Sequence, residues 1–124
     1  MRIAAAIIRD SVGRTLLVRK SGTDVFMQAG GKIEVNETAR DALVREVSEE
    51  LGADIVNAEY TGTYAAPAAN EPDHRVIAEV FICVLDAQPV PAAEIAEMIW
   101  FDPEHSPDLK IAPLSRLLMK EVVC

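Results

Sequence analysis

A single amphipathic helix, set among strand-like segments, is the feature that most constrains how this chain folds. Leu43, Val47 and Leu51 recur every four residues, a spacing that places apolar side chains on one face of a helix. Thr38 precedes this pattern at the spacing of a capping box, and Gly52 follows it as a stop. The sequence therefore predicts a helix that begins after Thr38 and ends before Gly52.

Strand patterns lie on both sides of this helix. The apolar segments 3–8 and 15–19 are joined by residues 10–13, whose composition favours a hairpin turn. The composition of four further segments also predicts strands, at residues 25–27, 55–64, 75–85 and 98–101. We therefore expect a chain rich in strands.

The remaining patterns complete the expected fold. The glycine pair Gly30 and Gly31 predicts a loop, because glycine allows backbone angles that other residues avoid. Residues 113–122 begin with proline and carry leucines at helical spacing, which predicts a closing helix. Strands interspersed with a central and a terminal helix predict one α/β domain over residues 1–124, a sandwich around a mixed β-sheet.

The balance of charge limits the partners that this chain can have. Its 124 residues fit one domain, and 20 acidic against 12 basic residues give a formal charge of −8. An acid excess repels phosphate backbones and anionic lipid heads, so we expect no nucleic-acid partner and no membrane. No apolar run approaches the roughly 20 residues of a membrane span, and the opening residues lack a secretory signal, so the expected location is cytoplasmic.

Three glutamates of the predicted helix fall close together. With Glu46 at 0°, an advance of about 100° per residue places Glu50 at about 40° and Glu49 at about 300°. The neighbouring stripe, between about 60° and 160°, holds the residues expected in the core: Leu43, Val44, Val47 and Leu51. The acids therefore border the buried face, either as a solvated acidic surface or as a seat for a hard divalent cation.

The segment containing these glutamates reads GKIEVNETARDALVREVSEELGA over residues 31–53. It resembles the Nudix box, G-x5-E-x7-R-E-U-x-E-E-x-G-U, in which U is a bulky aliphatic residue. All the invariant positions are filled, by Gly31, Glu37, Arg45, Glu46, Glu49, Glu50 and Gly52. Three departures remove no ligand: Ala53 stands at the last U, Ala29 replaces a frequent proline and Asn36 replaces a frequent glycine. The short chain and its strand order also look like the smaller, MutT-like members of the Nudix hydrolase family.

The resemblance implies a Nudix fold, an α/β/α sandwich, and metal-dependent hydrolysis of a nucleoside diphosphate linked to another group. The implied cofactor is Mg²⁺, or Mn²⁺ as in some members. By match to the box, the metal ligands are Glu46, Glu49 and Glu50, together with the backbone carbonyl of Gly31. A carboxylate-held metal can both neutralise a pyrophosphate and activate water, so the chemistry is consistent with the residues. Glu49 and Glu50 are the leading catalytic candidates.

The resemblance also suggests roles around this set. Arg45 is expected to hold the carboxylates in place, and Glu37 to tie the loop to the helix or to reach the metal through water. For these two residues, ordinary surface pairing is the alternative. Glu94 has the spacing from Trp100 that looks like the MutT-type arrangement, in which a late glutamate binds the metal or acts as base; a plain surface acid is the alternative.

Phosphate and base contacts are less specific in the sequence. Lys32, Lys20 and Arg19 are candidates for phosphate oxygens, although each alone is also compatible with a solvated cation. Four aromatic residues could stack a base, although an aromatic in a strand is usually part of the core: Phe26, Tyr64, Phe81 and Trp100.

Several alternatives remain open for the substrate and the assembly. The small size resembles nucleoside triphosphate pyrophosphohydrolases, so we expect a nucleoside triphosphate or a modified nucleotide as the small-molecule substrate. Pro67 falls near the place where a proline marks the ADP-ribose group, so ADP-ribose or a nucleotide sugar is the runner-up. A non-catalytic nucleotide-binding module is a third possibility. Both a monomer and a homodimer are compatible with the sequence.

Overall fold

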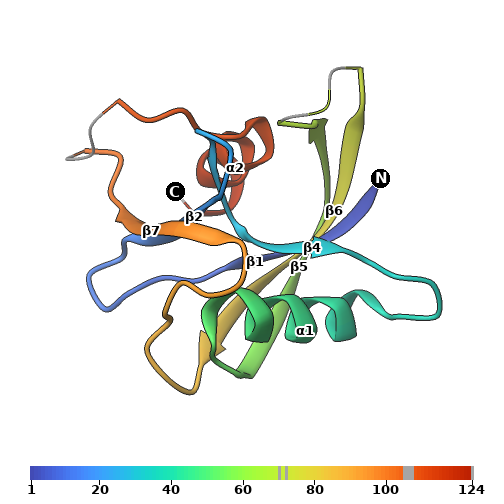
Figure 1. Cartoon of the computed structure of the whole chain (residues 1–124), viewed down its shortest axis with the longest axis horizontal. Coiled ribbons are helices and arrows are strands. Elements are labelled where there is room, and N and C mark those ends of the chain that lie inside the picture. Colours follow the sequence, from blue (N-terminus) through green and yellow to red (C-terminus); the bar gives the residue numbers. More distant parts are fainter. Residues whose placement is uncertain (70, 72, 105–107, 124) are drawn as a thin grey trace.

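Two β-sheets lie between helices in the computed structural model, which describes residues 1–69, 71, 73–104 and 108–123 (Figure 1). In Figure 1, helix α1 lies below the sheets and α2 lies above them. In chain order the elements are β1 (Arg2–Ile7), β2 (Thr15–Lys20), β3 (Phe26–Met27), β4 (Ala29–Lys32), α1 (Ala39–Leu51), β5 (Ile55–Pro67), β6 (Arg75–Leu85), β7 (Ile95–Phe101), α2 (Pro113–Leu118) and η1 (Met119–Val123). The expected α/β/α sandwich is confirmed.

The larger sheet is mixed, as the sequence predicts. Its strand order is β4-β1-β6-β5, in which β1 runs parallel to β6 and antiparallel to β4. The smaller sheet, β3-β2-β7, is antiparallel throughout. Strand β7 begins at Ile95, earlier than expected, because it continues along β2 to Lys20.

The predicted turn between the first two strands forms, but the strands separate beyond it. Asp10 accepts hydrogen bonds from the backbone N–H groups of Val12 (3.1 Å) and Arg14 (2.8 Å), which closes the turn. A bridge between Arg9 and Thr15 continues the hairpin. β1 then enters the larger sheet and β2 the smaller one. The hairpin therefore joins the two sheets instead of forming one pair.

The segment expected as a glycine loop is a strand. β4 pairs antiparallel with β1, with Ala5 opposite Gly30 and Ala4 opposite Gly31. Gly30 has a φ of 139°, and a Cβ built there would lie 2.0 Å from the backbone oxygen of Ala4. Only glycine fits so close to a neighbouring strand. The glycine that indicates a loop by composition is here required by strand pairing.

The predicted helix is confirmed at both ends. The Thr38 hydroxyl accepts a hydrogen bond of 3.0 Å from the Asp41 backbone N–H, and Gly52 closes the helix in the left-handed region at φ 63°. The closing helix differs from the expectation, because α2 ends at Leu118 and continues as a π-helical turn, η1. No helix in the described parts of the chain is long and apolar enough to cross a membrane.

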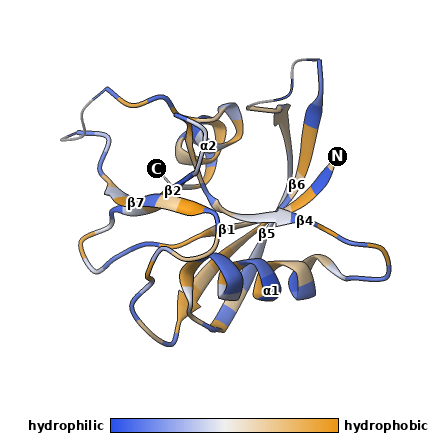
Figure 2. Ribbon diagram, in the orientation of Figure 1, coloured by the Kyte–Doolittle hydropathy of each residue, from blue (hydrophilic) through white to orange (hydrophobic). Residues whose placement is uncertain are grey.

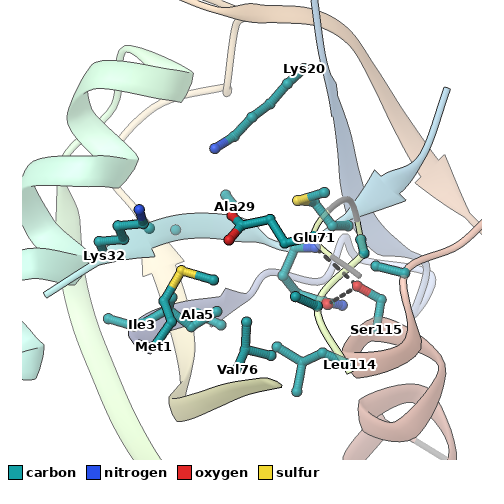
Figure 3. Close-up of a pocket in the computed structure, with 18 of the residues that line it drawn as sticks. Met1, Ile3, Ala5, Lys20, Ala29, Lys32, Glu71, Val76, Leu114 and Ser115 are labelled. Atoms are coloured by element: carbon teal, nitrogen blue, oxygen red, sulfur yellow. Dashed lines mark hydrogen bonds between the residues drawn. The ribbon is translucent and has the colours of Figure 1, made fainter. Parts of the chain in front are cut away.

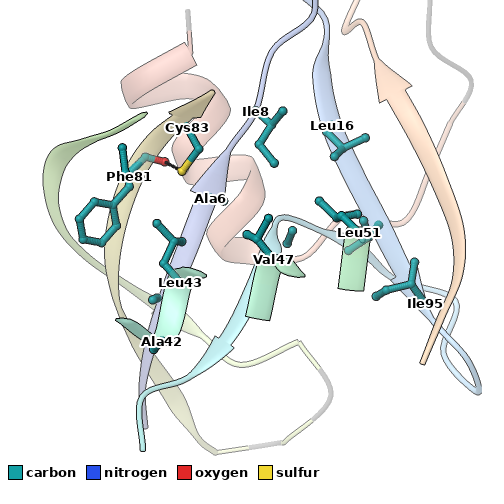
Figure 4. Packing of buried hydrophobic residues seen from close by; sticks show 14 residues of the cluster. Ala6, Ile8, Leu16, Ala42, Leu43, Val47, Leu51, Phe81, Cys83 and Ile95 are labelled. Carbon is teal, nitrogen blue, oxygen red and sulfur yellow. Dashed lines mark hydrogen bonds between the residues drawn. The ribbon is translucent and has the colours of Figure 1, made fainter. Parts of the chain in front are cut away.

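The core lies on both faces of the larger sheet. Hydrophobic and hydrophilic residues alternate along α1 (Figure 2), and Figure 4 shows Val47 and Leu51 among the side chains of Ala6 and Leu16. The opposite face packs Leu114 and other residues of α2 against the sheet. Two packed layers therefore cover the larger sheet, and α1 contacts β4 on its side of that sheet.

Candidate active site

The buried face of α1 includes one of the three glutamates. Glu50 is only 3% exposed, whereas Val44 is 40% exposed. The expectation that Val44 belongs to the core is therefore wrong, and the buried arc is rotated toward the acids. The reason is that β4 packs against the acid-bearing side of α1, where its glycines leave room. Glu50 thus lies inside the protein and not at its border.

Backbone contact holds the Glu50 carboxylate. The Gly30 N–H donates a hydrogen bond of 3.0 Å to Glu50 Oε1. Burial raises the pKa of Glu50 to about 7; the charges of Glu46 and Glu94 act in the same direction, whereas this hydrogen bond and the Lys20 charge oppose it. A carboxylate in this position is stabilised by any additional positive charge.

Glu46 lies against the second glycine of β4. A Cβ built on Gly31 would lie 2.6–2.8 Å from the atoms of the Glu46 carboxylate. The lack of a side chain at Gly31 therefore creates the space that Glu46 fills. Gly30 therefore holds the Glu50 carboxylate by a hydrogen bond, and Gly31 leaves the space that the Glu46 carboxylate occupies.

Arg45 organises the loop before the helix. Its Nε and Nη2 donate to the two oxygens of Glu37, both at 2.9 Å, and its Nη1 donates to Glu46 Oε1 at 2.7 Å. Nη2 also donates to the backbone oxygen of Lys32 at 3.2 Å. The Arg45 guanidinium and the Glu34 backbone N–H lower the pKa of Glu37 to about 2, and both carboxylates raise the pKa of Arg45. Arg45 and Glu37 therefore fix the position of Glu46.

Glu49 is the most solvent-accessible of the three helix glutamates. Its side chain is 56% exposed, and its Oε2 lies 3.8 Å from Arg45 Nη1. In the parts of the chain that the structure describes, no three His, Cys, Asp or Glu side chains converge closely enough to hold one metal ion. The donor set nevertheless suits a hard cation, since it consists of oxygens and includes a buried carboxylate, that of Glu50, whose ionised form needs a positive neighbour.

Two glutamates, Glu94 and Glu97, lie before Trp100 in the sequence and have different contacts. Glu97 accepts a hydrogen bond of 3.0 Å from Arg19 Nε, and Arg19 Nη1 donates to the Thr23 backbone oxygen at 2.9 Å. Glu94 is exposed, and its charge is one of those that raise the pKa of Glu50. Its backbone oxygen accepts a hydrogen bond of 2.8 Å from the Ser21 N–H. The guanidinium of Arg19 is thus engaged by Glu97 and by the Thr23 backbone.

A cavity of about 210 Å³ opens on the other side of the β4 glycines. Gly30, Gly31, Lys20 and Lys32 line it, and Figure 3 shows the Lys20 ammonium pointing toward the middle of the pocket. Residues from the larger sheet, the loop after β5 and α2 complete the wall, among them Ile3, Ala5, Pro67, Val76, Leu114 and Ser115. Two of the three predicted phosphate contacts therefore meet at one pocket next to the acidic cluster.

None of the pocket residues that the structure describes is aromatic. Phe26 and Phe81 are core residues, and Tyr64 and Trp100 pack against the core. Sequence reasoning did not select three polar residues that line the pocket, Gln28, Glu71 and Ser115. The available signal was weak: Gln28 is a single polar residue between Met27 and Ala29, just before the glycine pair.

Comparison with known proteins identifies the family. The family model described as NUDIX domain matches residues 1–122 of the chain. The chain belongs to the Nudix family. The Nudix relatives include the CTP pyrophosphohydrolase of Escherichia coli, 34% identical over 122 residues, which cover 90% of this chain and 82% of that protein. Another is the 8-oxo-dGTP diphosphatase of Haemophilus influenzae, 38% identical over 63 residues, 48% of this chain and 46% of that protein.

Solved structures agree with the Nudix fold. The MutT Nudix hydrolase from Burkholderia pseudomallei superimposes with a TM-score of 0.84 at 21% identity, covering 98% of this chain and 96% of that one. The chain is thus a Nudix hydrolase of the pyrophosphohydrolase group, a family that acts on small nucleotide substrates and generally uses divalent metal ions. The carboxylates on α1 and the pocket beside β4 form the candidate site of this Nudix hydrolase.

Proposed function

We propose that this Nudix hydrolase cleaves a phosphoanhydride bond of a nucleoside triphosphate or a modified nucleotide. The observation that carries the proposal is the position of Glu50, a buried carboxylate held by a glycine that also lines a cavity with two lysines. We assign the carboxylate oxygens on the α1 side of β4 to a cation, and the lysines of the cavity to phosphate. A polyphosphate needs both kinds of partner.

The metal ligands that we assign are the three glutamates of α1, Glu46, Glu49 and Glu50, with the backbone carbonyl of Gly31. When bound there, Mg²⁺ or Mn²⁺ supplies charge neutralisation for the phosphates and a lowered pKa for coordinated water. The chain itself keeps the donors in place, because Gly30 holds Glu50 and Arg45 holds Glu46. We assign Glu37 to positioning, since both of its oxygens bind Arg45.

Two further roles follow from the position of each side chain. Lys20 and Lys32 line the cavity and offer ammonium groups to the phosphate oxygens of a substrate. Glu94 is exposed and its charge acts on Glu50, and we assign it to accept the proton of the attacking water. Arg19 has no such role in this proposal, because Glu97 and Thr23 engage its guanidinium.

The size of the cavity favours a substrate of which only one part, such as the base, is enclosed, over one with a second large group beyond the phosphates. Its volume of about 210 Å³ is below the range of about 300–1,000 Å³ typical of pockets that enclose a whole drug-sized ligand. It therefore suits one part of a nucleotide, with the phosphates extending toward the glutamates. ADP-ribose is the second candidate, and the observation in its favour is that Pro67 lines the cavity.

Turnover of a substrate panel tests the proposal. The protein is incubated with Mg²⁺ and, in turn, the common nucleoside triphosphates, 8-oxo-dGTP, ADP-ribose, dinucleoside polyphosphates and nucleotide sugars, and products are separated by ion-exchange chromatography. We expect fastest release of a nucleoside monophosphate or diphosphate from a triphosphate. Faster cleavage of ADP-ribose or a nucleotide sugar would select the alternative substrate class.

A matched variant separates catalysis from binding. Glu50→Gln keeps the hydrogen-bond acceptor for Gly30 but removes the negative charge. We expect it to bind nucleotides without cleaving them. A folded wild-type protein that binds nucleotides but cleaves none of the panel would show that the chain is a non-catalytic nucleotide-binding module.

A further inference from the structure

The pocket contains a buried amide nitrogen whose hydrogen-bonding capacity is unused. The Gln28 side chain is 6% exposed. Among the buried side-chain nitrogen and oxygen atoms of the described residues, its Nε2 is the one left without a hydrogen-bond partner. Buried donors are almost always satisfied, so an unsatisfied donor in a pocket wall suggests a ligand that completes it. Gln28 lines the cavity assigned above to part of a nucleotide.

Ser115 determines which end of this amide is available. The Ser115 Oγ accepts the Gln28 backbone N–H at 3.2 Å. The same hydroxyl donates its proton to Gln28 Oε1, a contact visible at the labelled Ser115 in Figure 3. With the carbonyl engaged, Gln28 offers only N–H donors to a ligand. The pair joins a residue between β3 and β4 to a residue of α2 that is 87 positions away, and both side chains are buried.

The edges of the nucleobases differ in what they offer to such a donor. Guanine presents O6 and N7 as neighbouring acceptors, and pyrimidines present keto oxygens. Adenine has no keto oxygen, and its N7 acceptor lies beside an amino donor. A donor-only side chain therefore fits a keto base better than adenine, because the adenine amino group would face another N–H.

We propose that Gln28 is a specificity-determining residue that donates a hydrogen bond from Nε2 to a keto oxygen of the nucleobase, and that Ser115 positions it. This inference rests on the proposed function, since it takes the cavity as the site of the base. The neighbouring wall is aliphatic, with Met27, Val76 and Leu114 available to cover the faces of the ring. Nε2 is covered in the free protein, so the side chain turns slightly toward the base on binding, which its rotatable torsions allow.

Specificity constants test this assignment. The kcat/KM values for CTP, UTP, GTP and ATP are measured for the wild type and for Gln28→Leu, which keeps the size of the side chain and removes both N–H groups. In the wild type we expect a keto-base triphosphate to be preferred over ATP. In Gln28→Leu we expect kcat/KM for that substrate to fall by about 10- to 100-fold, with less than about a threefold change for ATP.

Two more variants control the measurement. Ser115→Ala frees Oε1, so the amide can present either end to a ligand; we expect the ratio of keto-base to ATP activity to approach one while the protein stays folded. Thr15→Val replaces another buried hydroxyl, on β2 and outside the pocket lining, and is expected to leave all the ratios unchanged. An unchanged ratio in both Gln28→Leu and Ser115→Ala, or a wild type that prefers ATP, would overturn the proposal.

Binding without turnover separates this inference from the proposed function. Titration calorimetry in EDTA compares CMP, UMP and GMP with AMP, for the wild type and Gln28→Leu. Selective binding of a keto base that depends on Gln28, without hydrolysis of any nucleotide, would support the specificity residue and contradict the enzyme assignment. The opposite result is hydrolysis of nucleotides with a base preference, and a monophosphate affinity, that are the same in Gln28→Leu as in the wild type. That result would support the enzyme assignment and contradict the role of Gln28.

Discussion

The backbone N–H of Gly30 donates a hydrogen bond of 3.0 Å to Glu50 Oε1, which joins the edge strand of the larger sheet to the central helix. Glu50 is nearly inaccessible to solvent, so this carboxylate depends on a few fixed partners. The charges of Glu46 and Glu94 both disfavour its ionised form. The contact therefore links the acidic cluster to the wall of the pocket, and it is the basis of the first two predictions.

Glu50→Gln is expected to lower kcat by about 100-fold or more, the scale of losing a metal ligand or a general base. The amide keeps an oxygen for Gly30, so the fold should persist. Addition of Mg²⁺ should raise the Tm of the wild type and leave that of the variant nearly unchanged, because binding to the folded state stabilises it. Wild-type activity in this variant would place the metal elsewhere.

The same variant is expected to be more stable than the wild type in EDTA at alkaline pH. Burial raises the pKa of Glu50 from 4.5 to about 7, so the folded state retains a proton that the unfolded state has lost. The free energy of unfolding of the wild type therefore falls as pH rises from about 4.5 to about 7, and the deficit persists above that. We expect Glu50→Gln to have a Tm higher by several degrees at pH 8 and a similar Tm at pH 4.5. If the Tm difference between Glu50→Gln and the wild type were the same at pH 8 and at pH 4.5, the raised pKa of a buried Glu50 would be contradicted.

The two glycines of β4 are expected to respond differently to alanine. In Gly30→Ala the new Cβ would meet the backbone oxygen of Ala4 at 2.0 Å, so β4 must move away from β1. We expect a loss of about 3 kcal/mol or more in the free energy of unfolding, measured by urea titration. Gly22→Ala is the matched control, because Gly22 has a φ of 84° and no atom near the new Cβ, which isolates backbone strain from the clash.

Gly31→Ala is expected to affect activity more than stability. Its Cβ would meet the end of a flexible side chain, the Glu46 carboxylate, at 2.6–2.8 Å, and Glu46 can move aside. We expect a change of about 1 kcal/mol or less in stability, with kcat lower by about tenfold or more because a proposed ligand is displaced. Unchanged kcat in a folded Gly31→Ala variant would remove Glu46 from the proposed metal site.

Glu37 is expected to make the loop before α1 sensitive to acid. Arg45, together with the Glu34 backbone N–H, lowers the pKa of Glu37 from 4.5 to about 2, so its stabilising contribution is present above about pH 4.5 and lost as pH falls toward 2. In Glu37→Gln we expect urea midpoints to decline less steeply over this window than in the wild type. Glu59→Gln removes an exposed carboxylate of β5 and is the control. Parallel pH profiles for wild type and Glu37→Gln would contradict the ion pair.

The sequence allowed the central helix to be predicted with its ends, because caps and apolar spacing act over a few residues. The Thr38 hydroxyl caps the start of the helix, and Gly52, which has no side chain, adopts the left-handed conformation that ends it. The prediction of a loop at Gly30 and Gly31 was wrong, because it used only local composition. The pairing of this segment with β1 depends on residues that are distant in the chain. Val44 was misplaced because angular position on a helix does not reveal which neighbour covers it.

Local order was therefore determined by the sequence itself: the strand-rich pattern, the capped helix and the spacing that places Glu46, Glu49 and Glu50 together. The tertiary structure decided which of these carboxylates is buried, that Glu97 rather than Glu94 pairs with Arg19, and that Gln28 meets Ser115. The physical reason is the distance along the chain over which each interaction acts. Helical periodicity and caps depend on near neighbours, but burial, strand register and contacts between residues 87 positions apart depend on how the two sheets pack between the helices.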